Sequence, residues 1–384
     1  MINSCVHFEN CSGCDFLDYQ YRDSLILKEN YLREIFQTSV KPIVASPKSI
    51  FYRHKLQLPF GKKKGKFENL LTLGLHSRDL SRIIDLKECQ IQDESMTEIS
   101  FIIRDYFREN NFMPFDEKKQ DGLLKYLIIR KSFFSSEILI CIVTSYNYTF
   151  KDQSISEIVL RLQDYIEKKN EGLSIAGILQ NINNRNTSMA LGEKFKTLYG
   201  KTFMKEKVAG NFFHVGISTF LQVNPYISDK LYSYVKSKIS QCERILDIYS
   251  GIGTLTLYLA DKADKIYGIE INPESVLNAN NAAKANQIKN AKFISGDATR
   301  SIQFVKEKID LIVVDPPRIG LTKELIDSCF QLSPKRIIYI SCDPQTLKRD
   351  LYYLENKYKV QEIQAFDMFP FTKHIETVVV LDRL

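Results

Sequence analysis

One cysteine near the carboxyl end of the chain stands where a catalytic nucleophile would be expected. Cys342 comes directly after the apolar run 337–341 and is followed by Asp343 and Pro344. An apolar run of β-branched and aromatic residues that ends at such a turn is typical of a buried strand. Because open α/β sheets bind ligands beyond the carboxyl ends of their strands, Cys342 is a candidate nucleophile. The alternative is a small apolar residue that ends a core strand.

A glycine turn and three acidic residues, which also follow strand-like runs, indicate a cofactor site. The strand-like run 244–248 leads into Gly251 and Gly253, and a helix-like run follows. This turn lacks the third glycine of a dinucleotide fingerprint, so a mononucleoside-like cofactor such as S-adenosylmethionine is favoured. Each acid alone could be a helix cap or a turn residue, but together they favour a binding site. They are Glu270, Asp297 and Asp315, at the ends of three successive strand-like runs.

Two further segments supply candidate side chains. Glu376 begins an apolar, strand-like tail, where burial could raise the pKa of its carboxyl group and make it a base. An acid in this position otherwise marks the solvated end of a strand. Gln222 and Asn224 precede the first strand of the carboxyl-terminal half and could close over a cofactor.

Four other cysteines have the spacing of ligands to an inorganic centre. Cys5, Cys11 and Cys14 form a C-x5-C-x2-C pattern, and Cys89 is the candidate fourth ligand. Four thiolates suit tetrahedral zinc or a 4Fe-4S cluster, and the spacing leaves both open. Eight cysteines in a chain of 384 residues favour metal or catalytic use in a reducing compartment over a disulfide framework. Cys141, inside an apolar run, is expected to be core.

The elements that must position these residues divide the chain into two domains. Strand-like and helical runs are mixed in residues 1–210, which predicts an α+β domain. A helix predicted at 16–36 is expected to pack against the cysteines of this domain. Strand and helix signals alternate in residues 211–384, which predicts a mostly parallel, doubly wound α/β sheet.

The composition is that of a globular protein, and its net charge is positive. Hydrophobic residues make up 44% and charged residues 26% of the chain. A net charge of +7 favours a polyanionic partner, and two lysine-rich segments are candidate contacts to nucleic acid, although such segments are usually only solvated faces. The segments contain Lys62, Lys63, Lys64 and Lys66, and Lys194, Lys196, Lys201, Lys205 and Lys207. Neither a secretory leader nor a membrane-spanning run is evident, so a cytoplasmic location is expected.

Three motifs together resemble the RNA uracil-C5 methyltransferases that use S-adenosylmethionine. They are Asp315-Pro-Pro-Arg318, Ser341-Cys342-Asp343-Pro344 and Phe369-Pro-Phe-Thr-Lys-His-Ile-Glu376. The amino-terminal cysteines resemble the iron-sulfur branch that modifies 23S ribosomal RNA, rather than the transfer-RNA branch. The TRAM domain, a small amino-terminal β-barrel of some relatives, is not expected here. The resemblance implies a Rossmann-like class I methyltransferase domain at 211–384 and a cluster-bearing, RNA-binding domain at 1–210.

The resemblance also implies roles for individual residues. Cys342 would be the nucleophile and Glu376 the base. The cluster ligands would be Cys5, Cys11, Cys14 and Cys89. Contacts to S-adenosylmethionine would come from Gln222, Tyr249, Thr254, Glu270, Asp297 and Asp315. Phe371 and Asp343 depart from the histidine and asparagine usual in the family, and both changes are expected near the reacting base.

This chemistry implies methylation of uridine carbon 5 through a covalent bond between Cys342 and carbon 6 of uracil. An ordinary thiol has a pKa of about 8.5, so we expect Arg318 or a helix terminus to lower the pKa of Cys342. The substrate would be a uridine flipped out of an RNA loop, and the enzyme is expected to be a monomer.

Three other readings stay open. A transfer RNA, in place of 23S ribosomal RNA, could be the substrate. The motif of enzymes that methylate exocyclic amines also begins with Asp-Pro-Pro, although it continues with an aromatic residue where this chain has Arg318. A metal-bound RNA-binding or assembly factor without activity is the remaining alternative.

Overall fold

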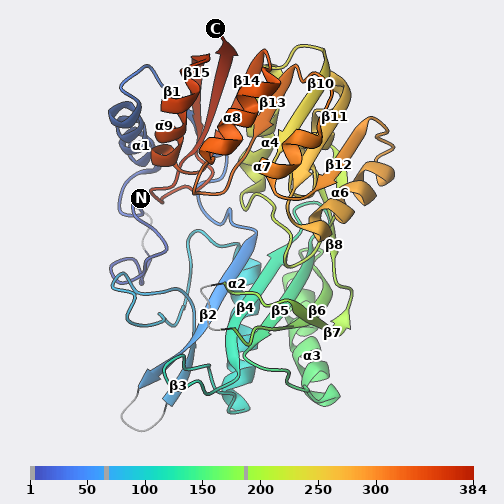
Figure 1. Cartoon of the computed structure of the whole chain (residues 1–384). Helices are drawn as coiled ribbons and strands as arrows, with labels where there is room; N and C mark the ends of the chain where they lie inside the picture. The colour runs from blue at the N-terminus through green and yellow to red at the C-terminus, as the bar shows by residue number, and fades with distance from the viewer. Residues whose placement is uncertain (1–4, 65–68, 186–188) are drawn as a thin grey trace. The chain divides into compact units, whose positions relative to one another are not determined.

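The computed structural model describes residues 5–64, 69–185 and 189–384 (Figure 1). The chain divides into two compact units. Unit 1 comprises residues 1–20, 48–206 and 214–218, and unit 2 comprises residues 21–47, 207–213 and 219–384. The domain predicted at residues 1–210 is interrupted, because residues 21–47 belong to unit 2.

Unit 2 is built on an eight-stranded sheet, in the order β1-β15-β16-β14-β13-β10-β11-β12 (Figure 1). β16 runs antiparallel to its neighbours β14 and β15, and the other pairs are parallel. The strand order reverses at β10 and β13, which is where doubly wound sheets bind ligands. The strands are β1 (Lys41–Val44), β10 (Cys242–Ile248), β11 (Ala263–Glu270), β12 (Ala291–Ser295), β13 (Leu311–Val314), β14 (Arg336–Ser341), β15 (Tyr358–Phe366) and β16 (Glu376–Arg383).

Several helices of unit 2 start at an Asn or Asp cap followed by proline. Asn224, Asn272 and Asp343 each accept a hydrogen bond from the first turn of the helix that follows. The cap satisfies an amide that has no partner within the helix, and proline is pre-shaped for the first helical position. The helices are α1 (Tyr21–Phe36), α4 (Pro225–Ser237), α5 (Thr254–Tyr258), α6 (Pro273–Ala285), α7 (Ala298–Ser301), α8 (Lys323–Leu332) and α9 (Pro344–Leu354).

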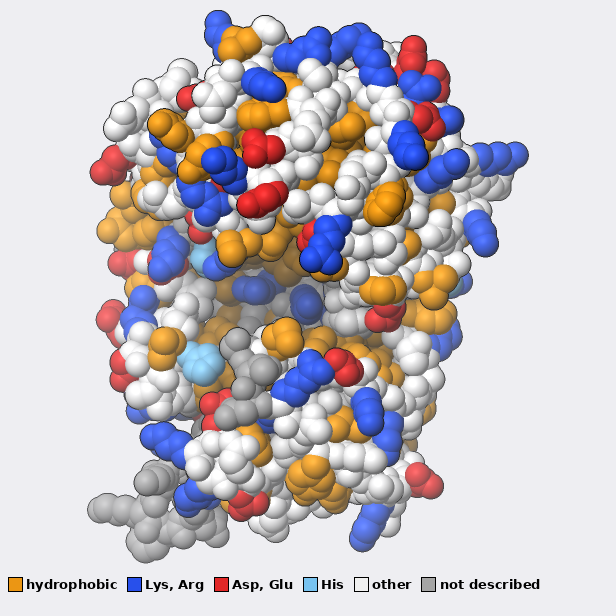
Figure 2. Space-filling view, in the orientation of Figure 1, with side chains coloured by type: hydrophobic (Ala, Val, Ile, Leu, Met, Phe, Trp, Pro, Cys, Tyr) orange, Lys and Arg blue, Asp and Glu red, His pale blue; other side chains and the backbone are white. Residues whose placement is uncertain are grey.

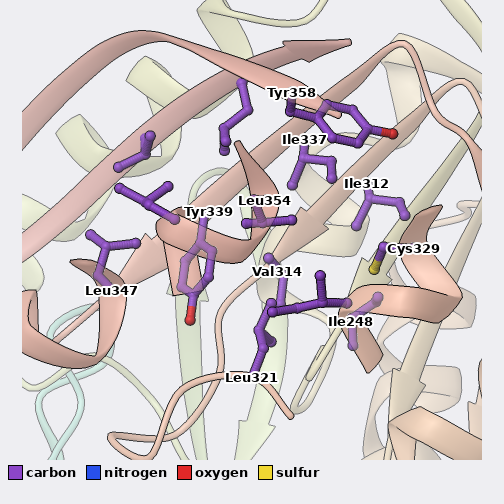
Figure 3. Close-up of a cluster of buried hydrophobic side chains, with 14 of the residues drawn as sticks. Ile248, Ile312, Val314, Leu321, Cys329, Ile337, Tyr339, Leu347, Leu354 and Tyr358 are labelled. Atoms are coloured by element: carbon purple, nitrogen blue, oxygen red, sulfur yellow. The ribbon is translucent and has the colours of Figure 1, made fainter. Parts of the chain in front are cut away.

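The core of unit 2 joins the central strands to the helices that follow them. Figure 3 shows Ile312 of β13 and Ile337 of β14 in one buried cluster with Cys329 of α8 and Leu354 of α9. Leu32 and Phe36 of α1 belong to the same cluster. The expectation that this helix packs against the cysteines is therefore wrong, because its apolar stripe is buried in the core of unit 2.

Unit 1 is an α+β unit, as predicted. Its six-stranded sheet has the order β3-β2-β4-β5-β6-β7, and only β5 and β6 pair in parallel. The strands are β2 (Lys55–Lys64), β3 (Asn69–Leu73), β4 (Leu124–Lys131), β5 (Glu137–Thr144), β6 (Ser174–Ile182) and β7 (Lys194–Gly200). Helices α2 (Glu94–Glu109) and α3 (Asp152–Lys169) share its core, and Cys141 is buried in β5 as expected. A separate two-stranded sheet is formed by β8 (Met204–Val208) and β9 (Asn211–Val215).

No helix in the described ranges is both long and apolar enough to cross a membrane.

Candidate active site

The register of two antiparallel strands brings Cys342 and Glu376 to the same edge of the sheet. Ser341, the last residue of β14, is paired with Thr377 of β16. Cys342 follows Ser341, and Glu376 precedes Thr377, so these two residues occupy the next opposing positions. Opposing residues of an antiparallel pair have Cα atoms about 4.5–5.5 Å apart. Cys342 and Glu376, the candidate nucleophile and base, lie in different segments of the sequence and are neighbours in the fold.

Asp315 adds a second carboxyl group at this edge. It directly follows β13, which pairs in parallel with β14, and its backbone N–H donates to Ile248 O at 3.3 Å. Burial raises the pKa of Asp315 to about 7. Burial, and then the charge of Asp315, raise the pKa of Glu376 well above its ordinary value. Two carboxyl groups in a buried place resist ionising together, so they favour holding a proton between them.

The pKa of Cys342 is raised to about 11, which corrects the expectation that it would be lowered. Burial is the largest cause, followed by the charges of Glu376 and Asp315, and Arg318 opposes them. The helix terminus offers little help, because the side chain of Asp343 accepts hydrogen bonds from Gln345 N and Thr346 N at 2.9 and 3.1 Å. An acid in that position occupies the amide donors that would otherwise stabilise a thiolate. The thiol is therefore protonated in the free protein.

The glycine turn and Glu270 form the second part of the site. Gly251 has φ +55° with open space where a side chain would be, and its N–H donates to Glu270 Oε2 at 3.0 Å. Asn272 N donates to Glu270 Oε1 at 2.8 Å. A carboxylate offers about four acceptor positions, so each oxygen of Glu270 keeps capacity for a ligand hydroxyl. At Gly253, also with positive φ, a Cβ would lie 2.6 Å from the Phe293 ring, so glycine is required there.

The remaining predicted cofactor residues have different surroundings. Tyr249 is half-buried with φ +66°, and its pKa is raised by burial and then by the charge of Asp297. Asp297 also caps α7 by accepting from Arg300 N at 3.2 Å, as the alternative reading had it. Thr254 begins α5, and Gln222 is half-buried before α4.

Asn224 does not have the position expected for closing over a cofactor. It is fully buried and caps α4, and its Nδ2 donates to Ser46 Oγ and Met368 O at 3.1 and 3.2 Å. These bonds use both donors of the amide, so Asn224 ties segments of unit 2 together.

The structure also shows residues that the sequence analysis missed. Tyr232 of α4 lies 3.4 Å from Thr254 through their hydroxyl oxygens, and its pKa is raised by burial and to a lesser degree by Asp315 and Glu376. It therefore lies beside Thr254 in the second part of the site. Buried Asp247 accepts from Thr256 Oγ1 at 2.5 Å, and burial raises its pKa to about 7. The available sequence signal was an acid in the apolar run 244–248, one residue before the end of β10.

Helix α9 holds the segment that carries Arg318. Asp350 is buried and accepts from Leu321 N at 2.7 Å and from Tyr339 Oη at 2.6 Å. Arg349 donates to Ile319 O at 2.8 Å. Gly320 has φ +77°, and a Cβ there would lie 2.5 Å from Asp350 Oδ2, so only glycine fits. Arg318 itself reaches His374, with its Nη2 at 3.4 Å from both ring nitrogens.

The four candidate ligand cysteines line one pocket of unit 1, together with Leu17, Leu75 and Leu86. Burial is the largest cause of a raised pKa at all four, and neighbouring cysteines contribute at Cys5, Cys14 and Cys89. At Gly13 a Cβ would lie 2.8 Å from Leu75, so this glycine lets the loop close on the pocket. Within the part of the chain that the structure describes, no group of three or more His, Cys, Asp or Glu side chains is arranged to hold a metal ion.

The lysines named in the sequence analysis are on the surface where the structure describes them. Lys62 and Lys63 in β2, and Lys194 and Lys196 in β7, are exposed. The side chains of Lys64 and Lys66 lie outside the described residues. On the face shown in Figure 2, Lys and Arg side chains are spread over the surface rather than gathered in a single patch.

Comparison with known proteins gives consistent matches. The family model for tRNA (Uracil-5-)-methyltransferase matches residues 189–384. A protein of Leptospira interrogans named as an uncharacterized RNA methyltransferase is 39% identical, covering 99% of this chain and 98% of its own length. A protein of the same description from Clostridium acetobutylicum is 35% identical, covering 99% of this chain and 83% of its own.

A solved structure extends the similarity to the whole fold. The Pyrococcus abyssi tRNA (uracil-54, C5)-methyltransferase in complex with S-adenosyl-L-homocysteine has a TM-score of 0.78 and 26% sequence identity. The match covers 97% of this chain and 86% of the Pyrococcus protein.

Proposed function

Because the chain belongs to the tRNA (uracil-5-)-methyltransferase family, and is thus an RNA methyltransferase, we propose that it methylates carbon 5 of a uridine in RNA. The observation that carries this proposal is the pairing of β14 with β16, which sets Cys342 opposite Glu376 beside Asp315. A thiol nucleophile and a carboxylate base at one sheet edge suit covalent catalysis on a pyrimidine.

Cys342 makes carbon 5 reactive. Its sulfur forms a bond to carbon 6 of uracil, and the electrons of the ring double bond move toward carbon 5 and the neighbouring carbonyl oxygen. The step requires a thiolate, and the raised pKa means that Cys342 must lose its proton when the substrate is bound. Arg318 is the cation of the site that favours the thiolate.

Glu376 completes the reaction. After carbon 5 has gained a methyl group, Glu376 takes the remaining proton from carbon 5, the ring double bond forms again and the bond from sulfur to carbon 6 breaks. A carboxylate whose pKa is raised by burial is a stronger base than an exposed one, once it is ionised. Asp315 would share the proton with Glu376 and hydrogen-bond the uracil edge or the cofactor.

S-adenosylmethionine fits the second part of the site, and it would supply an electrophilic methyl group on a sulfonium. The Pyrococcus abyssi relative was solved with the demethylated product of this cofactor. In this chain the glycine turn is open at Gly251, and Glu270 keeps acceptor capacity for ribose hydroxyls. The residues that would hold it are Gln222, Tyr249, Thr254, Glu270, Asp297 and Asp315.

The four cysteines of unit 1 would hold a 4Fe-4S cluster, and their loop would adjust as it binds, because in the described residues the thiols are not yet arranged as metal ligands. Support comes from the four thiols that line one pocket with apolar neighbours, and from the loop closure at Gly13. The reaction uses no electron transfer, so the cluster would shape the RNA-binding unit. Anaerobic iron and sulfide analysis with an absorption spectrum tests this assignment. Stoichiometric zinc without a visible absorption band would show that the centre is a zinc ion.

The substrate that we propose is a uridine in a loop of 23S ribosomal RNA, flipped out of its stack to reach the sheet edge. The cysteine quartet, which resembles that of the ribosomal branch, supports this choice. A transfer RNA is the second candidate, because the Pyrococcus abyssi relative is named for uridine 54 of tRNA.

Mapping 5-methyluridine in a deletion strain tests the function and separates these substrates. We expect one or more 5-methyluridines to disappear from 23S ribosomal RNA and to return when the gene is restored. Loss from transfer RNA alone would favour the second candidate. Unchanged 5-methyluridine in both RNA pools would overturn the proposal and favour a non-catalytic RNA-binding or assembly factor.

A further inference from the structure

Helix α1 carries a buried lysine that the proposed reaction does not use. The side chain of Lys28 is 1% exposed, and its Nζ lies 2.5 Å from Oδ1 of Asp367, which is 0% exposed. Lysine is rarely buried unless it is paired, because removing the ammonium from water is costly. Tyr21, at the start of the same helix, donates to the other carboxylate oxygen of Asp367 at 2.8 Å. Both oxygens of Asp367 are therefore held by α1.

The same ammonium binds two backbone carbonyls of the segment between β15 and β16. Lys28 Nζ donates to Phe369 O and to His374 O, each at 3.0 Å. With Asp367 these acceptors use all three donors of the ammonium. Asp367 follows the last residue of β15, and His374 lies two residues before Glu376. One nitrogen atom thus fixes both ends of the loop 367–374.

The rest of the loop is closed around this centre. Thr372 donates to Phe369 O through its N–H at 3.1 Å and its hydroxyl at 2.9 Å, and the hydroxyl accepts from His374 N at 3.3 Å. Phe371 is fully buried with φ +60°, and its ring centroid lies 5.5 Å from that of Tyr21. The departure noted at Phe371 is therefore a packing contact with α1.

We propose that Lys28 is a positioning residue for Glu376 and acts through the backbone of the loop 367–374. The inference rests on the proposed function, in which Glu376 takes a proton from carbon 5 of the bound uracil. Such a transfer needs the carboxylate within about 2.6–3.2 Å of its target, and a displacement of about 1 Å can slow a step about a hundredfold. Lys28 holds the carbonyl two residues before this carboxylate.

A purely stabilising role would predict a different outcome. Replacing a buried ion pair by neutral groups is often neutral for stability, whereas removing one partner leaves an unpaired buried charge. The variant K28M alone would leave Asp367 in that state. The double variant K28M/D367N removes the unpaired charge and also removes the donor that holds Phe369 O and His374 O. It therefore separates folding from positioning.

The experiment follows single turnovers of the full-length protein with an RNA that the wild type methylates. Formation and decay of the denaturant-resistant adduct between protein and RNA are timed, and thermal unfolding is recorded. We expect K28M/D367N to fold, to form the adduct within about threefold of the wild-type rate and to resolve it at least tenfold more slowly, since only the second step uses Glu376. The adduct should accumulate.

The matched control is R336M/D382N. Arg336 and Asp382 form a bidentate ion pair at the other end of β14 and β16, at 2.6 and 3.0 Å. This control should resolve the adduct at the wild-type rate. If K28M/D367N does not fold, T372V serves instead, because it loosens the same loop without changing a charge, and slower resolution is again expected.

Resolution of the adduct at the wild-type rate in K28M/D367N, or in T372V where the double variant does not fold, would overturn the inference. An equal fall in formation and resolution would also overturn it, because general damage slows both steps. A wild type that makes neither 5-methyluridine nor adduct would instead refute the proposed function itself.

Discussion

The sheet edge of unit 2 that holds Cys342 and Glu376 and the cysteine pocket of unit 1 are built in different ways. At the edge, Cys342 and Glu376 are placed by the hydrogen-bonded register of two strands. In the pocket, three of the four thiols come from the turn-rich segment 5–14, which is held by bonds such as Arg78 Nη2 to Cys14 O at 3.1 Å. A strand ladder fixes positions by itself, whereas a loop of thiols would gain its final geometry from the centre it binds.

The two regions share a thiol pKa raised chiefly by burial. At the edge, two carboxyl groups raise the pKa of Cys342 further, so the thiol is protonated until a substrate enters. In the pocket, the neighbouring cysteines act on one another, and a metal centre would relieve this by binding thiolates. A raised thiol pKa therefore fits both regions. At the edge it suits a nucleophile that stays protonated until the substrate binds, and in the pocket it suits thiols that bind a metal centre.

The largest effect should come from the edge. Replacing Cys342 by alanine removes the nucleophile, so methyl transfer should fall by at least about a thousandfold and no covalent adduct should form. Mass analysis of 5-methyluridine and denaturing gels of protein with RNA measure both. C242A is the control, since Cys242 is also half-buried but begins β10 at the opposite edge. An active C342A enzyme would refute the thiolate scheme.

Glu376 should give the next largest effect, with a different signature. E376Q keeps the shape of the side chain but removes the base, so product release should slow by about a hundredfold or more while the adduct accumulates. The adduct is measured on denaturing gels, with D382N at the far end of β16 as control. Absence of any accumulated adduct, with turnover lost, would mean that Glu376 acts before the covalent step.

The cysteine pocket should affect RNA binding more than chemistry. C14S should lose most of its bound iron and raise the KM for RNA about tenfold, or roughly 1.4 kcal/mol, with kcat nearly unchanged. Iron analysis and steady-state kinetics measure this. C141A, a core cysteine of the same unit, should keep its iron. If kcat of C14S fell as far as that of C342A, the cysteine pocket would affect the chemical step, contrary to this prediction.

The smallest effect concerns the dependence of stability on pH. The pKa of Asp315 is raised from 3.8 to about 7, so its protonated form is favoured in the folded protein. Its contribution to stability is present below the ordinary pKa and is lost as the pH rises through about 7. Between pH 5 and 7.5, urea unfolding should show D315N losing less stability than the wild type, by on the order of 1 kcal/mol. If D315N and the wild type lose the same stability between pH 5 and 7.5, the raised pKa of buried Asp315 is contradicted.

Local patterns in the sequence were enough to place individual residues at strand ends. The apolar run before Cys342 and the runs before Glu270 and Asp315 form β14, β11 and β13, and the acidic or thiol residues lie where those strands end. The predicted glycine turn follows β10, with positive φ at Gly251 and Gly253. These features depend on residues close together in the chain, so side-chain periodicity and turn chemistry suffice to predict them.

Only the tertiary structure decided how these residues act on one another. Strand register sets Cys342 opposite Glu376. Burial, and then the charges of two carboxyl groups, raise the pKa of the thiol. Lys28 binds the backbone of the segment before Glu376, so each of these interactions joins segments that are separated in the sequence. Helix α1 is a further example. Its apolar stripe predicted that one face is buried, but not that this face packs in the core of unit 2. The sequence determined which groups are present and where each strand ends. Pairing and burial, which bring together residues from different segments of the chain, determined their ionisation and their partners.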